Sequence, residues 1–229
     1  MVVDIGIFGA TGVIGSRAVA EAVERGHRVT AFSRDANRFP AERGSVTWQV
    51  ADWLDADSIA AAIAGLDVVI SAVNAGHGIE DTIANANNFV VGAQAMVRAL
   101  DQHPRIRVIT VGGAGSLEVA PGLQLVDTGA DFTRILTKEL RVPAEYVEPV
   151  LAGRAALGVY RLSNRNWTYL SPSSGRVEPG PRTGRFRVGG DQLLVAEDRG
   201  DLSAEDLAVA LLDEVEQPRF IQRRFTVGY

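Results

Sequence analysis

Three glycines at three-residue spacing are the strongest chemical signal in the chain. Gly9, Gly12 and Gly15 directly follow an apolar run and precede a segment rich in Ala and Glu. In a strand–turn–helix unit, the first glycine permits a tight turn, the second lets the backbone approach a pyrophosphate, and the third lets helix and strand pack closely. The start of the helix then offers free N–H groups and a partial positive charge to phosphate. We therefore predict a dinucleotide site formed by Gly9, Thr11, Gly12, Val13, Ile14 and Gly15, with a degenerate domain that binds nothing as the alternative.

The residues after the second apolar run bear on the choice between NAD and NADP. A carboxylate there would accept hydrogen bonds from the ribose hydroxyls of NAD and repel the extra phosphate of NADP. This chain has Ser33 and Arg34 instead, a hydroxyl and a guanidinium that suit a 2′-phosphate, and Arg38 could add to the site. Asp35 complicates this interpretation, although in the first turn of a helix it would favour the helix dipole. We predict a preference for NADP(H) over NAD(H); the alternative is that Arg34 is a solvated surface charge.

Alternating strand-length and helix-length segments must position these residues. Apolar runs predict strands over residues 2–8, 28–32, 46–50, 67–72, 105–111, 167–170 and 224–227. Helical spacing predicts helices over residues 16–25, 55–64, 80–100, 150–162 and 203–214, with a short one near 133–141. This alternation is typical of an α/β, Rossmann-type, doubly wound and mostly parallel sheet with helices on both faces and a small C-terminal substrate-side region.

One domain is expected over residues 1–229, because no linker, internal repeat or low-complexity tract interrupts the chain. The regular alternation loosens after residue 111. Residues 112–150 and 171–200 are expected to form a lid and loops on the substrate side, and the Gly-, Pro- and Arg-rich stretch 175–190 reads as an exposed loop or hairpin.

Composition excludes several other classes of function. The formal net charge of −5 argues against broad nucleic-acid binding, because neutralising phosphates requires a basic face. The absence of cysteine excludes disulfides, thiolate metal sites and thiol nucleophiles. The longest stretch without a charged residue, 82–97, is too short and too polar to span a bilayer, and no signal peptide is visible. We therefore expect a cytoplasmic protein. No metal site is expected either, because no cluster of His, Asp or Glu residues has the spacing of metal ligands.

Five segments carry a family resemblance: 9–15 (GATGVIG), 111–117 (VGGAGSL), 167–172 (WTYLSP), 189–194 (GGDQLL) and 224–229 (RFTVGY). Together they resemble atypical short-chain dehydrogenases/reductases of the NAD(P)H-binding branch, which includes NmrA-like proteins, biliverdin reductase B and NADH-flavin-reductase-like proteins. The resemblance covers essentially the whole chain. It is specific for the fold and the cofactor class, and much less specific for the substrate.

The resemblance implies further cofactor contacts at the ends of the predicted strands. Asp52 matches the family residue that bonds the adenine amino group, with a plain turn residue as the alternative, and Trp53 would flank the ring. The segment after the fourth strand would run beside the nicotinamide ribose, and the segment after the sixth would lie near the nicotinamide. The expected contacts are Ala72, Val73, Asn74, Gly112, Ser171 and Pro172, with Ser173 facing the substrate.

The usual catalytic pair of active short-chain dehydrogenases, a Tyr four residues before a Lys, is missing. The chain has a single lysine, Lys138, and Arg134 stands four residues before it. Tyr169 lies in an apolar strand and is expected in the core, whereas Tyr146, in the expected lid, is a candidate substrate contact. The chain therefore carries no phenol positioned as the usual acid.

The missing pair constrains the hydride acceptor. Reduction of an ordinary ketone makes a strongly basic alkoxide, so a positioned acid typically contributes 10²–10⁴-fold. A flavin or quinone takes hydride into a conjugated, electron-poor system, so water can supply the proton and the protein mainly positions two rings. Ser116, where the family places its serine, is a candidate hydrogen-bond donor to an acceptor carbonyl, with a turn hydroxyl as the alternative. His77 is a candidate proton donor.

These expectations combine into an NAD(P)H-dependent oxidoreductase, NADPH-preferring, that reduces a small-molecule flavin (FMN or FAD) or quinone. An NmrA-like redox sensor that binds NADP(H) without turnover is the alternative, and an enzyme resembling sugar epimerases and dehydratases is a third option. A homodimer through the helix at 80–100 is expected from the short-chain relatives, although packing on the sheet already explains the apolar stripe of that helix.

Overall fold

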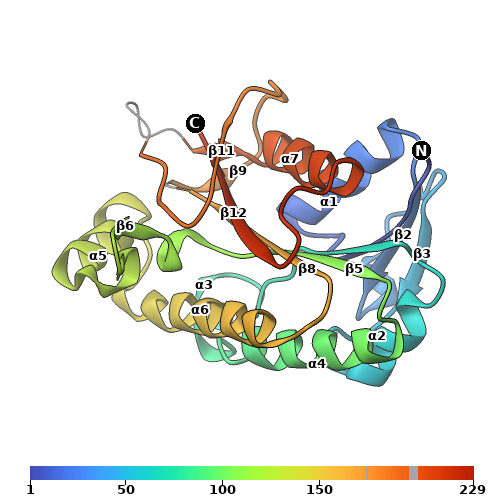
Figure 1. Ribbon diagram of the computed structural model, residues 1–229, viewed down its shortest axis with the longest axis horizontal. Coiled ribbons are helices and arrows are strands. Elements are labelled where there is room, and N and C mark those ends of the chain that lie inside the picture. Colours follow the sequence, from blue (N-terminus) through green and yellow to red (C-terminus); the bar gives the residue numbers. More distant parts are fainter. Residues whose placement is uncertain (174, 196–200) are drawn as a thin grey trace.

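A twisted, mostly parallel sheet runs through the centre of the molecule (Figure 1). The structure is a computed structural model, and it describes residues 1–173, 175–195 and 201–229. The strands of this sheet are β1 (Asp4–Phe8), β2 (Arg28–Ser33), β3 (Thr47–Val50), β4 (Val68–Ser71), β5 (Arg107–Val111), β8 (Trp167–Pro172), β10 (Arg187–Gly189) and β12 (Arg223–Gly228).

The order of the strands creates a crevice at one end of the sheet. From edge to edge the order is β10-β12-β8-β5-β4-β1-β2-β3, with β10 antiparallel to β12 and the other neighbours parallel. The chain runs outward from β1 to β3, then returns to β4 and runs outward on the opposite side. At such a reversal the loops after neighbouring strands diverge, which leaves room for a ligand at their carboxyl ends. The predicted doubly wound α/β fold is confirmed.

Helices cover both faces of the sheet (Figure 1). They are α1 (Val13–Glu24), α2 (Ala56–Ile63), α3 (Ile79–Ala84), α4 (Asn88–Gln102), α5 (Ala130–Arg134), α6 (Val147–Leu162) and α7 (Ala204–Glu216). The helices α1 and α7 pack together on one face, and α4 lies between α2 and α6 on the other. Two short two-stranded sheets lie outside the central one: β6 (Glu118–Ala120) with β7 (Leu123–Gln124), and β9 (Val177–Glu178) with β11 (Leu202–Ser203).

Two helix predictions need correction. The expected helix over 80–100 is broken into α3 and α4, because Asn85 ends the first helix with its side-chain amide on the carbonyl of Asp81 (2.9 Å). Asparagine competes for nearby backbone groups in this way and so favours helix ends. The expected helix near 133–141 is also divided, because α5 ends at Arg134 and a π-helical turn continues over Ile135–Glu139.

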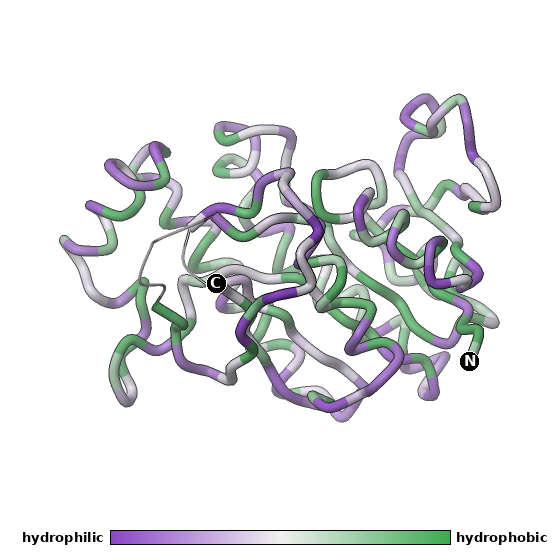
Figure 2. Tube along the Cα trace, turned by 90° about the horizontal axis from the view of Figure 1, so that it is seen from above, coloured by the Kyte–Doolittle hydropathy of each residue, from purple (hydrophilic) through white to green (hydrophobic). Residues whose placement is uncertain are grey.

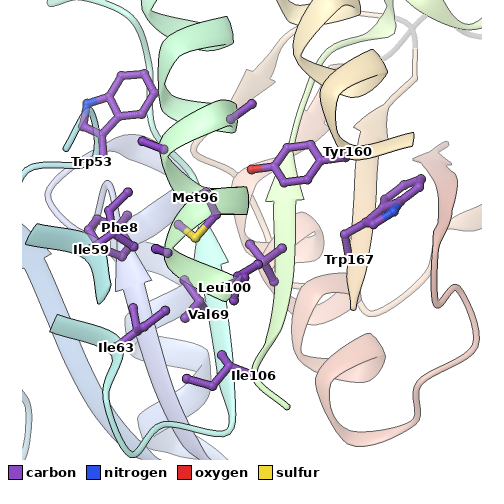
Figure 3. Packing of buried hydrophobic residues seen from close by; sticks show 14 of the residues in the cluster. Phe8, Trp53, Ile59, Ile63, Val69, Met96, Leu100, Ile106, Tyr160 and Trp167 are labelled. Atoms are coloured by element: carbon purple, nitrogen blue, oxygen red, sulfur yellow. The ribbon is translucent and has the colours of Figure 1, made fainter. Parts of the chain in front are cut away.

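The core divides into one hydrophobic cluster on each face of the sheet. Figure 3 shows the cluster under α2, α4 and α6, in which Met96 lies between Trp53 on one side and Tyr160 on the other. Along the trace, hydrophobic residues concentrate in the interior strands and hydrophilic residues in the outer turns (Figure 2). The apolar side of α4 is therefore buried within the chain itself, and a homodimer through this helix stays a prediction.

A buried carboxylate, Asp206, holds the C-terminal region to the start of α7. It accepts hydrogen bonds from the backbone amides of Thr183 and Gly184 (both 2.7 Å) and from the Tyr229 hydroxyl (2.8 Å). Burial alone would raise the pKa of Asp206, but these hydrogen bonds and one from the Thr183 hydroxyl outweigh it and hold the pKa below its usual value. The ionised side chain therefore stabilises the folded state.

Asp206 should accordingly make folding stability depend on acid pH. A depressed pKa contributes stability above the unfolded value of about 3.9, and that stability is lost as the pH falls through the folded value. We expect Asp206→Asn to lower the free energy of unfolding by about 1.5–3 kcal/mol at pH 7, the usual range for hydrogen bonds to a charged group. Urea unfolding of both proteins between pH 7 and pH 3 measures this, and a difference that stays constant with pH would contradict it.

Candidate functional site

A cavity of about 1520 Å³ opens along the carboxyl ends of five neighbouring parallel strands. Each of these five strands contributes to the lining either its last residue or the residue that follows it. These residues are Gly9 after β1, Ser33 in β2, Ala72 after β4, Gly112 after β5 and Pro172 in β8. This is the edge of an open α/β sheet at which ligands bind.

The predicted site residues line this cavity, apart from three. Gly15 packs directly beneath the loop, because a Cβ atom there would stand 2.1 Å from the carbonyl oxygen of Gly9. Asp52 accepts a hydrogen bond from the backbone amide of Leu54 (3.0 Å), as a turn residue does, and is not part of the lining. Ser171 is fully buried within β8. The adenine contact of Asp52 stays a prediction, and a direct cofactor contact of Ser171 has no support from this geometry.

The glycine loop forms a cradle at the start of α1. Gly9 has a φ of +77°, and a Cβ atom there would stand 2.3 Å from the carbonyl oxygen of Ala72. The Gly12 amide donates to the Gly9 carbonyl (2.9 Å), which closes the turn. Gly12 supplies no side-chain cap to α1, and the first turn carries no acidic residue. The backbone amides of this first turn are therefore suited to bind a phosphate group. Val13, the first residue of the turn, lines the cavity.

Two arginines face the cavity beyond the end of β2. Arg34 and Arg38 are both exposed, and within the part of the chain that the structure describes neither has a carboxylate within 4.0 Å. Asp35, the neighbouring carboxylate, instead accepts the backbone amide of Asn37 (2.8 Å) and caps a short 3₁₀ turn. Ser33 completes this corner. Guanidinium groups without a carboxylate partner, beside a hydroxyl, fit an anionic ligand such as a 2′-phosphate.

His77 lies at this same end of the cavity. Its Nε2 atom is 2.9 Å from Nη1 of Arg38, and its backbone amide donates to Asp81 (2.6 Å). Ser116 follows β5, three strands away from β2 in the sheet, or about 14 Å at the usual strand spacing. The contact with Arg38 places the His77 imidazole beside the exposed arginines, and its role as a proton donor to the hydride acceptor stays a prediction.

The middle of the cavity is built by Trp53 and by the loop after β4. The indole of Trp53 is largely buried and lies against Gly92 of α4, where a Cβ atom would stand 1.9 Å from the ring. Val73 and Asn74 also line the cavity, and the Asn74 amide donates to the Thr82 hydroxyl (3.0 Å). This hydrogen bond fixes the loop that runs beside the glycine cradle.

The end of the cavity beyond β5 and β8 has a largely apolar wall, although Glu139 and Arg154 also belong to the lining. Leu125, Phe132, Leu136 and Val150 contribute to its wall, and the first three belong to a separate hydrophobic cluster within the expected lid at 112–150. These residues were not among the predicted site residues, although the four-residue spacing of Phe132 and Leu136 is a usable signal. Residues 174 and 196–200 of the expected loops at 171–200 lie outside the described residues.

At this end of the cavity, two predicted substrate contacts, Tyr146 and Ser173, have a limited capacity to transfer a proton or to hydrogen-bond to a ligand. Tyr146 is half-buried, and burial raises the pKa of its phenol. The hydroxyl of Ser173 donates to the Leu194 carbonyl (2.7 Å) and accepts the amide of the same residue (2.8 Å). Ser173 therefore fixes the segment around Leu194 and has little hydrogen-bonding capacity left for a ligand.

Burial keeps the two other phenols near the cavity, Tyr160 and Tyr169, in the neutral form. Burial raises the pKa of Tyr160 to about 12, and it raises the pKa of Tyr169 further. The Tyr169 hydroxyl donates to the Gly153 carbonyl (3.1 Å), and Tyr169 is in the core as predicted. A phenol with a raised pKa is a weaker acid, and the Tyr169 proton is in addition already engaged with a backbone carbonyl.

Ser116 stands at the end of a 3₁₀ turn, Ala114–Ser116, on the cavity wall. The residue is 5% exposed, and its hydroxyl oxygen accepts a hydrogen bond from Nη1 of Arg224 (2.8 Å). Arg224 also reaches the backbone carbonyl of Ser116 (2.8 Å) and is held by Asp191. Ser116 is therefore firmly positioned, as both of its predicted roles, substrate contact and turn hydroxyl, would require.

No group of three or more His, Asp or Glu side chains within residues 1–173, 175–195 and 201–229 is arranged to hold a metal ion. Over the same residues, none of the helices has both the length and the apolar character needed to cross a membrane.

Comparisons with known proteins match the whole chain. A family model described as NAD(P)H-binding matches residues 9–218. The chain is 43% identical to a Burkholderia pseudomallei protein named "putative exported protein", with a TM-score of 0.81 over 99% of this chain and 100% of that one. It is 32% identical to a "putative epimerase" from Bacteroides thetaiotaomicron, with a TM-score of 0.80 over 100% and 98%. It is 27% identical to a "putative NADH-flavin reductase" from Streptococcus pneumoniae, with a TM-score of 0.78 over 99% of each chain.

Proposed function

Because the chain belongs to the NAD(P)H-binding family, we propose that it is an NADPH-preferring reductase that delivers hydride to a flavin or a quinone. The observation that carries this proposal is one continuous cavity with two different ends. At one end a glycine cradle and two arginines without a carboxylate partner among the described residues face the cavity, and at the other an apolar wall faces it. The first end suits a dinucleotide, and the second suits a flat, largely apolar ring.

The cofactor end would hold NADPH through its phosphates. The first-turn amides of α1 would bind the pyrophosphate, and Ser33, Arg34 and Arg38 would bind the 2′-phosphate. His77, which contacts Arg38, belongs to this end and adds ring nitrogens within reach of the same group. A bound dihydronicotinamide would supply hydride, two electrons and one proton, to the acceptor ring, and water would supply the second proton.

At the acceptor end, the chain's own residues would orient the ring rather than protonate it. Phe132 and Leu136 offer an apolar face, and Ser116 offers a hydroxyl beside it. The Tyr169 hydroxyl is engaged with the Gly153 carbonyl, and burial raises the pKa values of Tyr160 and Tyr169, which weakens both phenols as acids toward a strongly basic alkoxide product. A reduced flavin or quinone is weakly basic and needs none, which favours those acceptors over ketones and over the acid–base chemistry of an epimerase.

A second candidate function is an NmrA-like sensor that binds NADP(H) without turnover. The same shortage of proton donors at the acceptor end supports it. Ser173 and Tyr169 are both engaged in internal hydrogen bonds at the acceptor end. A sensor needs the cofactor end alone, whereas a reductase also needs room for a second ring. The apolar wall formed by Leu125, Phe132, Leu136 and Val150 favours the reductase.

Steady-state oxidation of NADPH with riboflavin, FMN, FAD and a panel of quinones tests the proposal. We expect acceptor-dependent loss of NADPH absorbance with at least one of them. Gly12→Val, which places a side chain on the cavity side of the cradle, is the control for contaminating reductases and should abolish the signal. Tight NADPH binding with no oxidation by any acceptor would refute the reductase and support the sensor.

A further inference from the structure

A buried cation stands directly behind the acceptor end of the cavity, and the proposed cofactor site does not use it. Arg224 lies on β12, is 5% exposed, and carries a guanidinium whose burial lowers its pKa. Asp191 is its counter-ion, with a hydrogen bond from Nε of 2.8 Å. Asp191 also pairs with Arg161 at the surface (3.0 Å). Burying a charged guanidinium costs free energy unless hydrogen bonds compensate for it, so the other contacts of Arg224 bear on its role.

Those remaining contacts go to one residue of the cavity wall. Nη1 of Arg224 donates to both the hydroxyl and the carbonyl oxygen of Ser116, at 2.8 Å each. A guanidinium donates hydrogen bonds and cannot accept them, so the Ser116 hydroxyl must be the acceptor in this pair. Its proton must then point away from Arg224. Among the hydrogen bonds of the described residues, the Ser116 hydroxyl takes part only in this one, as the acceptor.

We propose that Arg224 is a positioning residue that makes Ser116 a dedicated hydrogen-bond donor to the hydride acceptor. The inference rests on the proposed reductase function. Negative charge grows on an acceptor oxygen or nitrogen as hydride arrives at the ring, and an O–H aimed at that atom stabilises it more in the transition state than in the ground state. The proton stays on Ser116 throughout, and no bond to it is broken.

This arrangement differs from a merely structural contact in a measurable way. If Arg224 acts through the Ser116 hydroxyl, the two residues form one unit, and removing either should remove the same stabilisation. If Arg224 only holds the 3₁₀ turn through the Ser116 carbonyl, its loss should add to the loss of the hydroxyl. A double-mutant cycle separates the two cases.

The cycle uses Ser116→Ala, Arg224→Lys and the double variant, with Arg161→Lys as the matched control. Arg161 shares Asp191 with Arg224, but among the described hydrogen bonds it makes none to Ser116. We expect each of the first two variants to lower kcat with the preferred acceptor about three- to tenfold, the range for one hydrogen bond, with NADPH affinity unchanged. The double variant should be no slower than the slower single one, and Arg161→Lys should match the wild type.

A second measurement is independent of turnover. Riboflavin fluorescence in the presence of saturating NADP⁺ gives an equilibrium affinity, which should fall in Ser116→Ala and Arg224→Lys to the same extent as in the double variant. Additive losses in kcat and affinity, or an Arg224→Lys protein whose Tm and NADPH affinity fall together, would overturn the inference. If none of the flavins or quinones supports NADPH oxidation by the wild type, the reductase proposal fails. The riboflavin affinities of the double-mutant cycle then still test the Ser116–Arg224 pair. Absence of both turnover and riboflavin binding would overturn both proposals.

Discussion

Replacing Arg34 with alanine should weaken NADPH binding by roughly one to two orders of magnitude and leave NADH binding almost unchanged. Arg34 is exposed on the cavity wall just past β2, and no described carboxylate pairs with it. A hydrogen bond to a charged group contributes about 1.5–3 kcal/mol, and each 1.4 kcal/mol is a factor of ten in affinity. NADH lacks the 2′-phosphate, so it has nothing to lose from the substitution.

Isothermal titration of both cofactors against wild type and variant measures this effect. Arg43→Ala is the matched control, because Arg43 carries the same charge nearby but stacks over Phe39 (5.2 Å to the ring centroid) and does not line the cavity. Since Arg34 is exposed, its contribution should shrink as salt rises and the Debye length shortens. Equal losses for NADH and NADPH would show that Arg34 supports the fold or the adenine pocket and that the 2′-phosphate is bound elsewhere.

The elements that carry the cofactor end could be predicted because their signals are local. Apolar runs and glycine spacing identify β1, the loop at Gly9 and the start of α1 within fifteen residues of sequence. Ser33 and Arg34 are adjacent, so their shared corner follows from the end of one strand. In each of these cases a short stretch of chain determines both the backbone and the chemistry.

Contacts between distant segments carry no such signal. Arg38 meets His77 across 39 residues, and Arg224 meets Ser116 across 108. Only the strand order, which brings these segments together at the sheet, creates either pair. The break at Asn85 was missed for a different reason: the apolar stripe continues in phase through 80–100, whereas the asparagine side chain competes for the backbone.

Replacing Arg107 with methionine should lower the free energy of unfolding by about 3–5 kcal/mol, the usual cost of breaking a buried ion pair. Arg107 on β5 and Glu214 on α7 are both buried and paired, and this pair ties α7 to the sheet. Burial lowers the pKa of Arg107, and the charge of Glu214 opposes that shift. Glu214 also accepts the backbone amides of Arg219 (3.1 Å) and Phe220 (2.9 Å), so it orders the turn that leads into β12.

The loss should come mainly from the charge that is left behind. Arg107→Met strands the Glu214 carboxylate in the interior, whereas Arg107→Met with Glu214→Leu removes both charges and should recover part of the stability. Asp127→Asn, at a more exposed pair with Arg154, should cost only about 0–1 kcal/mol. Urea unfolding gives these differences directly, and a Tm drop of roughly 10 °C accompanies the first for a chain of this size. If the double variant were less stable than Arg107→Met by a further 3 kcal/mol, the amides of Arg219 and Phe220 would outweigh the stranded charge, and Glu214 would serve chiefly to hold the approach to β12.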